Sequence, residues 1–151
     1  MMNEKFVLLV EDNSDDVDLT QIAFKRCQIT NELIVVGDGL EALDFLFGEG
    51  KYAGRDTSEL PSVMLLDLKL PFVSGVEVLK RVRMAEGKIS RLPVVVLSST
   101  SNMQEIEECE RLGINRYCKK PDNFTAFQKT IEDIRGSYLE RERFQHRIGN
   151  K

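Results

Sequence analysis

The stretch Val63-Met64-Leu65-Leu66-Asp67 decides the fold, because four consecutive apolar residues end abruptly in a carboxylate. Two other stretches have the same form: residues 6–10 run into Glu11-Asp12, and residues 94–97 run into Ser98-Ser99-Thr100. Apolar residues that follow one another without alternating polar ones predict strands that are covered on both faces. Such strands are typical of the centre of a parallel sheet that has helices on either side.

Apolar runs of this kind alternate along the chain with amphipathic segments, which is the pattern of repeated βα units. We expect strands near residues 5–10, 33–36, 63–66, 94–97 and 116–118. The prediction is therefore an open α/β fold in which five parallel strands are flanked by five helices. In sheets of this class, ligands bind outside the carboxyl ends of the strands.

Several helices have recognisable start signals. A capping residue is followed three positions later by an acid in three places: Asp38 with Glu41, Ser74 with Glu77, and Asn102 with Glu105. An extended last helix is expected from about residue 123 to 145, with apolar residues at three- and four-residue steps: Phe124, Phe127, Ile131, Ile134 and Tyr138. That apolar stripe predicts a helix face that packs on the sheet or on a partner.

Length and charge limit the classes of protein to consider. The chain has 151 residues and a net charge of −4, which predicts one domain spanning residues 1–151. Its apolar stretches are too short to span a membrane or to form a signal peptide, so we expect a cytoplasmic protein. Charges of both signs are interspersed without a basic patch, which argues against direct DNA binding.

Cysteine and histidine usage argues against several other kinds of site. Cys27, Cys109 and Cys118 are odd in number and lack C-x-x-C spacing, which disfavours a disulfide framework and a zinc site. We expect them to be packed, reduced thiols. The single histidine, His146, lies in a polar tail and is expected to be solvated and not catalytic.

The strand ends bring different functional groups to one edge of the predicted sheet. Glu11 and Asp12 follow the first strand, Asp67 the third, Ser98 the fourth, and Lys120 the fifth. Three carboxylates, a hydroxyl and an ammonium group suit a divalent metal ion and a phosphoryl group. Taken singly, each residue also fits a helix cap or a surface position, so the interpretation depends on their convergence.

In this order and spacing, these residues resemble the receiver domain of bacterial response regulators, of the CheY-like kind. The resemblance is carried by Glu11-Asp12, Asp67-x-x-x-Pro71-x-x-x-Gly75, Ser98 and Lys120-Pro121, and it covers the chain from about residue 5 to residue 135. It implies a doubly wound, flavodoxin-like parallel sheet with the strand order 2-1-3-4-5.

The resemblance also implies a chemistry. Asp67 would accept a phosphoryl group from a histidine kinase or a phosphotransfer protein, with Mg²⁺ or Mn²⁺ as the cofactor. The implied metal ligands are Glu11, Asp12, Asp67 and the backbone carbonyl of Lys69, while Lys120 would balance charge on the phosphoryl oxygens. Catalysis would be limited to phosphotransfer to Asp67 and hydrolysis from it, so we do not expect an enzyme with another substrate.

A signalling role for Ser98 and Tyr117 is implied in the same way. The Ser98 hydroxyl would bond the new phosphoryl group, and Tyr117 would then change its rotamer. The face formed by the fourth helix, the fifth strand and the fifth helix would report the change. Glu11 stands where Asp is commoner in the family, and Lys69, Ser99 and Thr100 stand where side chains would modulate the access of water to the acyl phosphate.

A finer resemblance is to stand-alone regulators that are paired with phytochrome-type histidine kinases. It depends on the irregular loop of residues 48–61, the helix start at residues 38–46 and the extended last helix. Such regulators can form dimers through the last helix, which implies a homodimer here. The pair Tyr138-Leu139 departs from the aromatic pair that this subgroup would place near the end of that helix.

Three other functions are alternatives. A phosphorylation-independent, receiver-shaped adaptor would signal through its last helix alone, but it has no physical need for three clustered carboxylates. A haloacid-dehalogenase-type phosphatase needs a second acid two residues after the nucleophile, where this chain has Lys69. A flavodoxin-like FMN carrier needs a phosphate-binding loop after the first strand, where Glu11 and Asp12 would repel the phosphate.

Overall fold

Five parallel strands form one sheet in the order β2-β1-β3-β4-β5, as predicted. The computed structural model describes residues 5–99 and 101–139. The strands are β1 (Val7–Val10), β2 (Leu33–Val36), β3 (Val63–Leu66), β4 (Val94–Ser98) and β5 (Arg116–Lys119). The predicted bounds are confirmed for β2 and β3, whereas β1 begins two residues later than expected, and β4 and β5 each extend one residue further.

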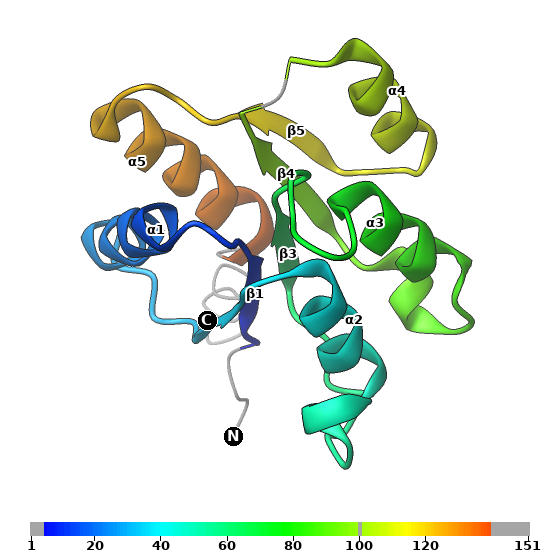
Figure 1. The fold of residues 1–151 in the computed structure, drawn as a ribbon. Coiled ribbons are helices and arrows are strands. Elements are labelled where there is room, and N and C mark those ends of the chain that lie inside the picture. Colours follow the sequence, from blue (N-terminus) through cyan, green and yellow to red (C-terminus); the bar gives the residue numbers. More distant parts are fainter. Residues whose placement is uncertain (1–4, 100, 140–151) are drawn as a thin grey trace, which may run out of the picture.

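Helices cover both faces of the sheet. They are α1 (Ser14–Arg26), α2 (Gly39–Phe47), α3 (Gly75–Met84), α4 (Met103–Arg111) and α5 (Phe124–Ile134). In Figure 1, α1 and α5 lie on one face, and α2, α3 and α4 lie on the other. The doubly wound architecture that the sequence predicts is therefore confirmed.

Side-chain caps set the starts of these helices. Asp38 and Ser74 accept hydrogen bonds from the backbone N–H groups of Glu41 and Glu77. Asn102 caps α4 in the same way, and Asn123 caps α5. Each cap satisfies amides that have no partner within the helix, so the predicted start signals act as expected.

The sheet divides the core into two layers. Alternate strand residues such as Leu8, Met64 and Val96 pack under α2 and α3, whereas Leu9, Leu65 and Val95 pack under α1 and α5. These strand residues are almost completely buried. Continuous apolarity in the three central strands is explained by this arrangement, because both faces of each strand are covered.

The apolar stripe of α5 faces the sheet. Ile131 and Ile134 are fully buried, and Phe124, Phe127 and Tyr138 pack at the edge of the same layer. A π-helical turn, η3 (Arg135–Leu139), follows α5 directly. The part of the predicted last helix from residue 140 to 145 lies outside the described residues.

Backbone register aligns the functional strand ends. Val10 pairs with Leu66, and Ser98 pairs with Lys119. Glu11 and Asp67 are therefore the first residues beyond adjacent strands, and Lys120 is the first residue beyond β5. Their positions at one edge follow from strand pairing alone.

No helix within the described part of the chain is both long and apolar enough to cross a membrane. The cytoplasmic location expected from the sequence stays a prediction.

The start of α2 is held to the following loop through Glu41. Its carboxylate accepts hydrogen bonds from the Gly37 N–H at 2.8 Å and the Tyr52 hydroxyl at 2.7 Å, and Lys51 Nζ lies 2.9 Å away. Tyr52 belongs to a 3₁₀ turn, η1 (Gly50–Tyr52), within the loop that the sequence marks as irregular. Burial alone would raise the pKa of Glu41, but these bonds together hold the pKa below its ordinary value.

This network predicts a pH-dependent contribution to stability. Because the folded-state pKa of Glu41 is depressed, its contribution is fully present above the unfolded value of 4.5 and is lost as pH falls through the folded pKa. We expect Glu41→Gln to lower the free energy of unfolding at pH 7 by roughly 1–2 kcal/mol. In urea titrations, the difference from wild type should shrink progressively below about pH 4.5.

Glu49→Gln is the matched control, because Glu49 is exposed in the same region and makes no side-chain cap bond. It should change the unfolding free energy little at either pH. A difference for Glu41→Gln that stays constant from pH 7 to pH 3 would show that its charge does not carry the effect.

Candidate functional site

Asp67 lies at the carboxyl end of β3, between the ends of β1 and β4. Its backbone N–H donates to the Val10 carbonyl at 3.1 Å, and the Glu11 N–H donates to the Val36 carbonyl at 3.0 Å. These bonds continue the sheet pairing by one residue and place the two acids side by side. Asp67 is only 7% exposed and Glu11 only 4%, so both carboxylates lie at the floor of the site.

A third carboxylate completes an acidic cluster. Glu11, Asp12 and Asp67 each offer an oxygen, and these oxygens all lie within 4.8 Å of one another. Asp12 is exposed, so the cluster opens to solvent on its side. Mg²⁺ prefers oxygen ligands and retains water molecules, and Mn²⁺ has similar preferences. The donor set, with one open side, fits either ion.

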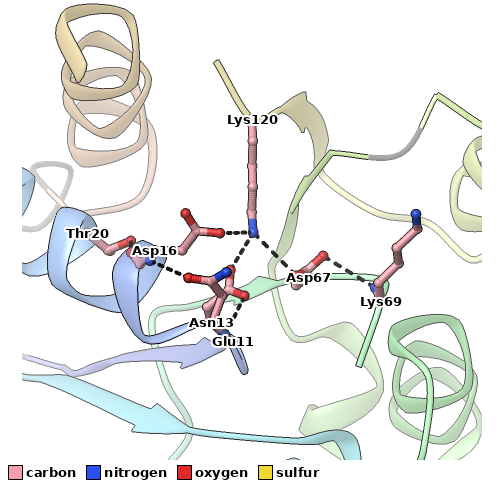
Figure 2. A network of polar contacts seen from close by, with 7 residues as sticks. All are labelled: Glu11, Asn13, Asp16, Thr20, Asp67, Lys69 and Lys120. Atoms are coloured by element: carbon pink, nitrogen blue, oxygen red, sulfur yellow. Dashed lines mark hydrogen bonds and ion pairs between the residues drawn. The ribbon is translucent and has the colours of Figure 1, made fainter. Parts of the chain in front are cut away.

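The ammonium group of Lys120 lies among carboxylates from three parts of the chain, namely the end of β1, the end of β3 and the first turn of α1. Its Nζ atom is 2.6 Å from Glu11 Oε1, 2.7 Å from Asp16 Oδ2 and 3.3 Å from Asp67 Oδ2. Figure 2 shows the lysine reaching down between the three acids. The Lys120 N–H also donates to the Ser98 carbonyl at 2.9 Å, which ties the lysine backbone to the end of β4.

Burial and charge oppose each other in this cluster. Burial raises the pKa of Glu11 to about 7, and Asp67 adds to the rise, while the hydrogen bond and the charge of Lys120 limit it. For Lys120, burial lowers the pKa, but the hydrogen bonds to Asp16 and Glu11 and the charge of Asp67 outweigh burial, so the net shift is upward. The ammonium group is therefore fully charged at neutral pH, and the carboxylates need positive charge nearby.

Asp16 is a residue of the candidate site that the sequence analysis did not predict. It lies in the first turn of α1, where its backbone N–H donates to Asn13 Oδ1 at 3.1 Å. Asn13 and Asp16 have the same spacing as the cap residues of the other helices. The rule that a capping residue is followed three positions later by an acid, applied to Asn13, would have placed Asp16 in the first helical turn after β1.

The predicted signalling residues lie on the two strands that follow β3 in the sheet order, Ser98 at the end of β4 and Tyr117 within β5. Ser98 is fully buried at the end of β4, and Ser99 follows it at an exposed position. Tyr117 is half-buried in β5 and packs against the core layer under α2 and α3. Thr100, which we expected to modulate the site, lies outside the described residues.

Lys69 contacts the site through its backbone. Its N–H donates to Asp67 Oδ1 at 3.3 Å, while its side chain is exposed and extends away from Lys120 (Figure 2). The predicted metal contact of its carbonyl and the predicted influence of its side chain stay predictions.

Two close approaches fix the loop between β3 and α3. A Cβ atom at Gly75 would overlap the carbonyl oxygen of Asp67, and a Cβ atom at Gly39 would overlap the carbonyl oxygen of Val73. Gly75 therefore lets α3 begin directly against the backbone of the candidate acceptor. At Gly39, the first turn of α2 packs against the same loop. The glycine eight residues after Asp67 in the sequence pattern thus has a steric cause.

Phe72 occupies an unusual position in this loop. Its φ is +67°, its side chain is 86% exposed, and the Val73 N–H donates across it to the Pro71 carbonyl at 2.8 Å. A bulky residue with positive φ is strained, and tight turns closed between residues i and i+2 at positive φ are rare. The loop therefore holds its shape at a cost in backbone energy.

Comparisons with known proteins point to one family. The response regulator receiver domain family matches residues 7–132. The response regulator Rcp1 of Synechocystis is 37% identical over 136 residues, which cover 90% of this chain and 90% of Rcp1.

Solved structures give the same result. The Mn²⁺-bound form of Rcp1 superposes with a TM-score of 0.81 at 36% identity, covering 91% of this chain and 96% of that one. The phosphorylated cyanobacterial phytochrome response regulator RcpA also has a TM-score of 0.81, at 35% identity, with coverage of 91% and 95%. The bacteriophytochrome response regulator RtBRR is 43% identical, with a TM-score of 0.74 and coverage of 87% and 78%. The predicted resemblance to CheY-like receivers, including the phytochrome-associated subgroup, is confirmed.

The strain at Phe72 can be measured. We expect Phe72→Gly to raise the free energy of unfolding by about 1 kcal/mol, because roughly 1–3 kcal/mol of strain is relieved while the added glycine costs about 0.5–1 kcal/mol of chain entropy. Urea unfolding with a fixed slope measures the change. Phe72→Ala is the matched control, since it removes the ring but keeps the Cβ atom. If the two variants are equally stable, the loop is not strained at this residue.

Proposed function

The chain belongs to the response regulator receiver family, and from this premise we propose that it accepts a phosphoryl group from phosphohistidine on Asp67. The observation that carries the proposal is the position of Asp67 at the end of β3, within an acidic cluster and 3.3 Å from the ammonium of Lys120. Receivers are signalling domains, so the expected chemistry serves a relay and not turnover of a separate substrate.

The proposed reaction is a phosphoryl transfer between two side chains. An oxygen of the Asp67 carboxylate attacks phosphorus and forms the O–P bond, while the P–N bond of the donor phosphohistidine breaks and its electron pair returns to the ring nitrogen. The donor ring carries a proton on its other nitrogen, so it leaves as neutral imidazole without a separate acid. The product is an acyl phosphate on Asp67. The reaction needs positioning and charge compensation more than it needs an acid or a base. Strand ends that hold the acids, and the ammonium group of Lys120, would meet these two needs.

Glu11, Asp12 and Asp67 would hold Mg²⁺ or Mn²⁺, with the Lys69 carbonyl as the further oxygen ligand. Bound there, the metal ion would neutralise negative charge that develops on the phosphoryl oxygens. Rcp1 has been crystallised with Mn²⁺, which supports the choice of ion.

Charge balance explains why both a cation and Lys120 are needed. With all three clustered carboxylates ionised, a divalent ion and the ammonium group would neutralise them, and the charge of Asp16 would give the site a net charge of about −1. A phosphoryl group adds roughly two more negative charges. Lys120, which contacts Asp67 at 3.3 Å, would bond one of the new oxygens.

We propose that the signal leaves through Ser98 and Tyr117. Ser98 lies beside the site at the end of β4, and its carbonyl is bonded to the backbone of Lys120. A bond from its hydroxyl to the phosphoryl group would draw the loop after β4 inward and free the space for Tyr117 to turn. The face of α4, β5 and α5 would then change its affinity for a partner, by about 1–3 kcal/mol if the coupling is of ordinary size.

The proposed partner is a sensor histidine kinase of the phytochrome type, or a phosphotransfer protein. Similarity to RcpA and RtBRR supports the phytochrome pairing. We also propose that the chain forms a homodimer through its last helix. The remaining parts of the proposal are that residues 1–151 form one receiver domain and that this domain does not bind DNA directly.

Phosphorylation is tested by intact-protein mass spectrometry after incubation with a small acyl-phosphate donor. Wild type should gain one phosphoryl group in the presence of Mg²⁺ and little without it, because the acidic cluster repels the donor until a cation is bound. Asp67→Asn should gain none. If wild type gains none under conditions that phosphorylate a known receiver, the relay is wrong and the adaptor becomes the leading function.

Metal binding gives a second test. Mg²⁺ should raise the free energy of unfolding of wild type by about 2.7 kcal/mol at a hundredfold excess over its dissociation constant. Asp12→Asn should lose most of this response, and in EDTA it should be as stable as wild type or more so, because a repelling charge has been removed. Asp15→Asn is the control, because Asp15 is an exposed acid in the first turn of α1. This variant should respond to Mg²⁺ like wild type. An unchanged response in Asp12→Asn would place the ion elsewhere.

A further inference from the structure

We propose that Asp16 is a positioning residue for Lys120. Together with Glu11 it anchors the ammonium group, so that the remaining N–H is directed at Asp67 and at the phosphoryl group it would carry. The inference rests on the proposed phosphorylation of Asp67 and adds a fourth acid to the site. Glu11, Asp12 and Asp67 form the candidate metal cluster, whereas Asp16 belongs to α1 and contacts the lysine.

The three contacts of Lys120 are unequal. Its distances to Glu11 and Asp16 are 2.6 and 2.7 Å, at or below the usual range for a charge-assisted N–H···O bond, whereas the distance to Asp67 is 3.3 Å. An ammonium group has three N–H donors, and here each has one carboxylate to meet. Two bonds therefore hold the group, and the third is loose and points to the acceptor.

Asp16 is itself held in place. Its N–H donates to Asn13 Oδ1 at 3.1 Å, and its carbonyl accepts from the Thr20 hydroxyl at 2.7 Å, with Thr20 buried. Figure 2 shows these contacts on the side of Lys120 opposite Asp67. The anchor thus belongs to the first turn of a capped helix and not to a free loop.

Such an anchor has a physical purpose. Lysine carries its charge on a flexible four-carbon stem, and fixing that charge before the reaction removes an entropic cost from the transition state. The loose bond to Asp67 can be exchanged for a phosphoryl oxygen while the bonds to Glu11 and Asp16 remain. Lys120 then needs no rearrangement when the phosphoryl group arrives.

Asp16 has a competing role to consider, that of a latch that keeps Lys120 away from Asp67 until phosphorylation. The geometry favours the anchor, because Lys120 contacts Asp16 and Asp67 at the same time. The two roles predict opposite effects. Removing a latch accelerates phosphorylation, whereas removing an anchor slows it.

The test uses the full chain, a small acyl-phosphate donor and saturating Mg²⁺. We expect Asp16→Asn to slow phosphorylation about 10-fold and also to slow hydrolysis of the acyl phosphate. Both steps need Lys120 placed against phosphoryl oxygens. Asp15→Asn removes the same charge from the same helical turn and should match wild type in both rates. Circular dichroism and thermal unfolding of each variant establish that it is folded.

A double-mutant cycle separates positioning from a structural effect. In the Lys120→Met background, Asp16→Asn should cause no further slowing, because the residue it positions is gone. Equal slowing with and without Lys120, faster phosphorylation, or rates equal to those of Asp15→Asn would each overturn the inference. If wild type is phosphorylated at Asp67 and Asp16→Asn behaves like wild type, only the role of Asp16 fails. If wild type is not phosphorylated, the proposed function fails with it.

Discussion

Repulsion among carboxylates at one edge of the sheet is the constraint on which the rest of the site depends. Glu11 and Asp67 are nearly inaccessible to water, and Asp12 lies within reach of both. Like charges so placed are stable only where positive charge or hydrogen-bond donors compensate them. The ammonium of Lys120 supplies part of that compensation from the end of β5, two strands away from β3 and three from β1. The site is therefore an electrostatic arrangement that favours cations, and backbone pairing in the sheet sets the positions of Glu11 and Asp67.

Strand pairing explains why the arrangement is possible in a chain whose acids and lysine are so far apart in sequence. The parallel register fixes which residues follow the last paired positions, and those residues meet at one edge whatever their chemistry. Burial on both faces then makes slippage of the register costly, because one residue of shift would turn every core side chain to the opposite layer. The packing of the core thus fixes the strand register, and the register fixes where the charged residues lie.

Much of this could be predicted from the sequence. The apolar runs located the strands, the capping residues located three helix starts, and the strand-terminal residues located Asp67, Glu11 and Lys120 at one edge. The contact of Asp16 with Lys120 could not be predicted, because it joins residues 104 positions apart and depends on the path of a flexible side chain. The positive φ of Phe72 could not be predicted either, since it is imposed by closure of the loop and not by a backbone preference of phenylalanine.

The close approach of Gly39 to Val73 has a consequence for how movement spreads through the molecule. With no side chain between them, the first turn of α2 and the loop after Asp67 are in direct backbone contact. A displacement of that loop toward Gly39 would meet backbone directly, with no side chain between them to change rotamer. This contact links the loop after Asp67, the candidate acceptor, to the helix that follows β2, the edge strand farthest from β5. If Asp67 carries the proposed phosphoryl group, this backbone contact would extend the change to α2 in addition to the proposed face of α4, β5 and α5.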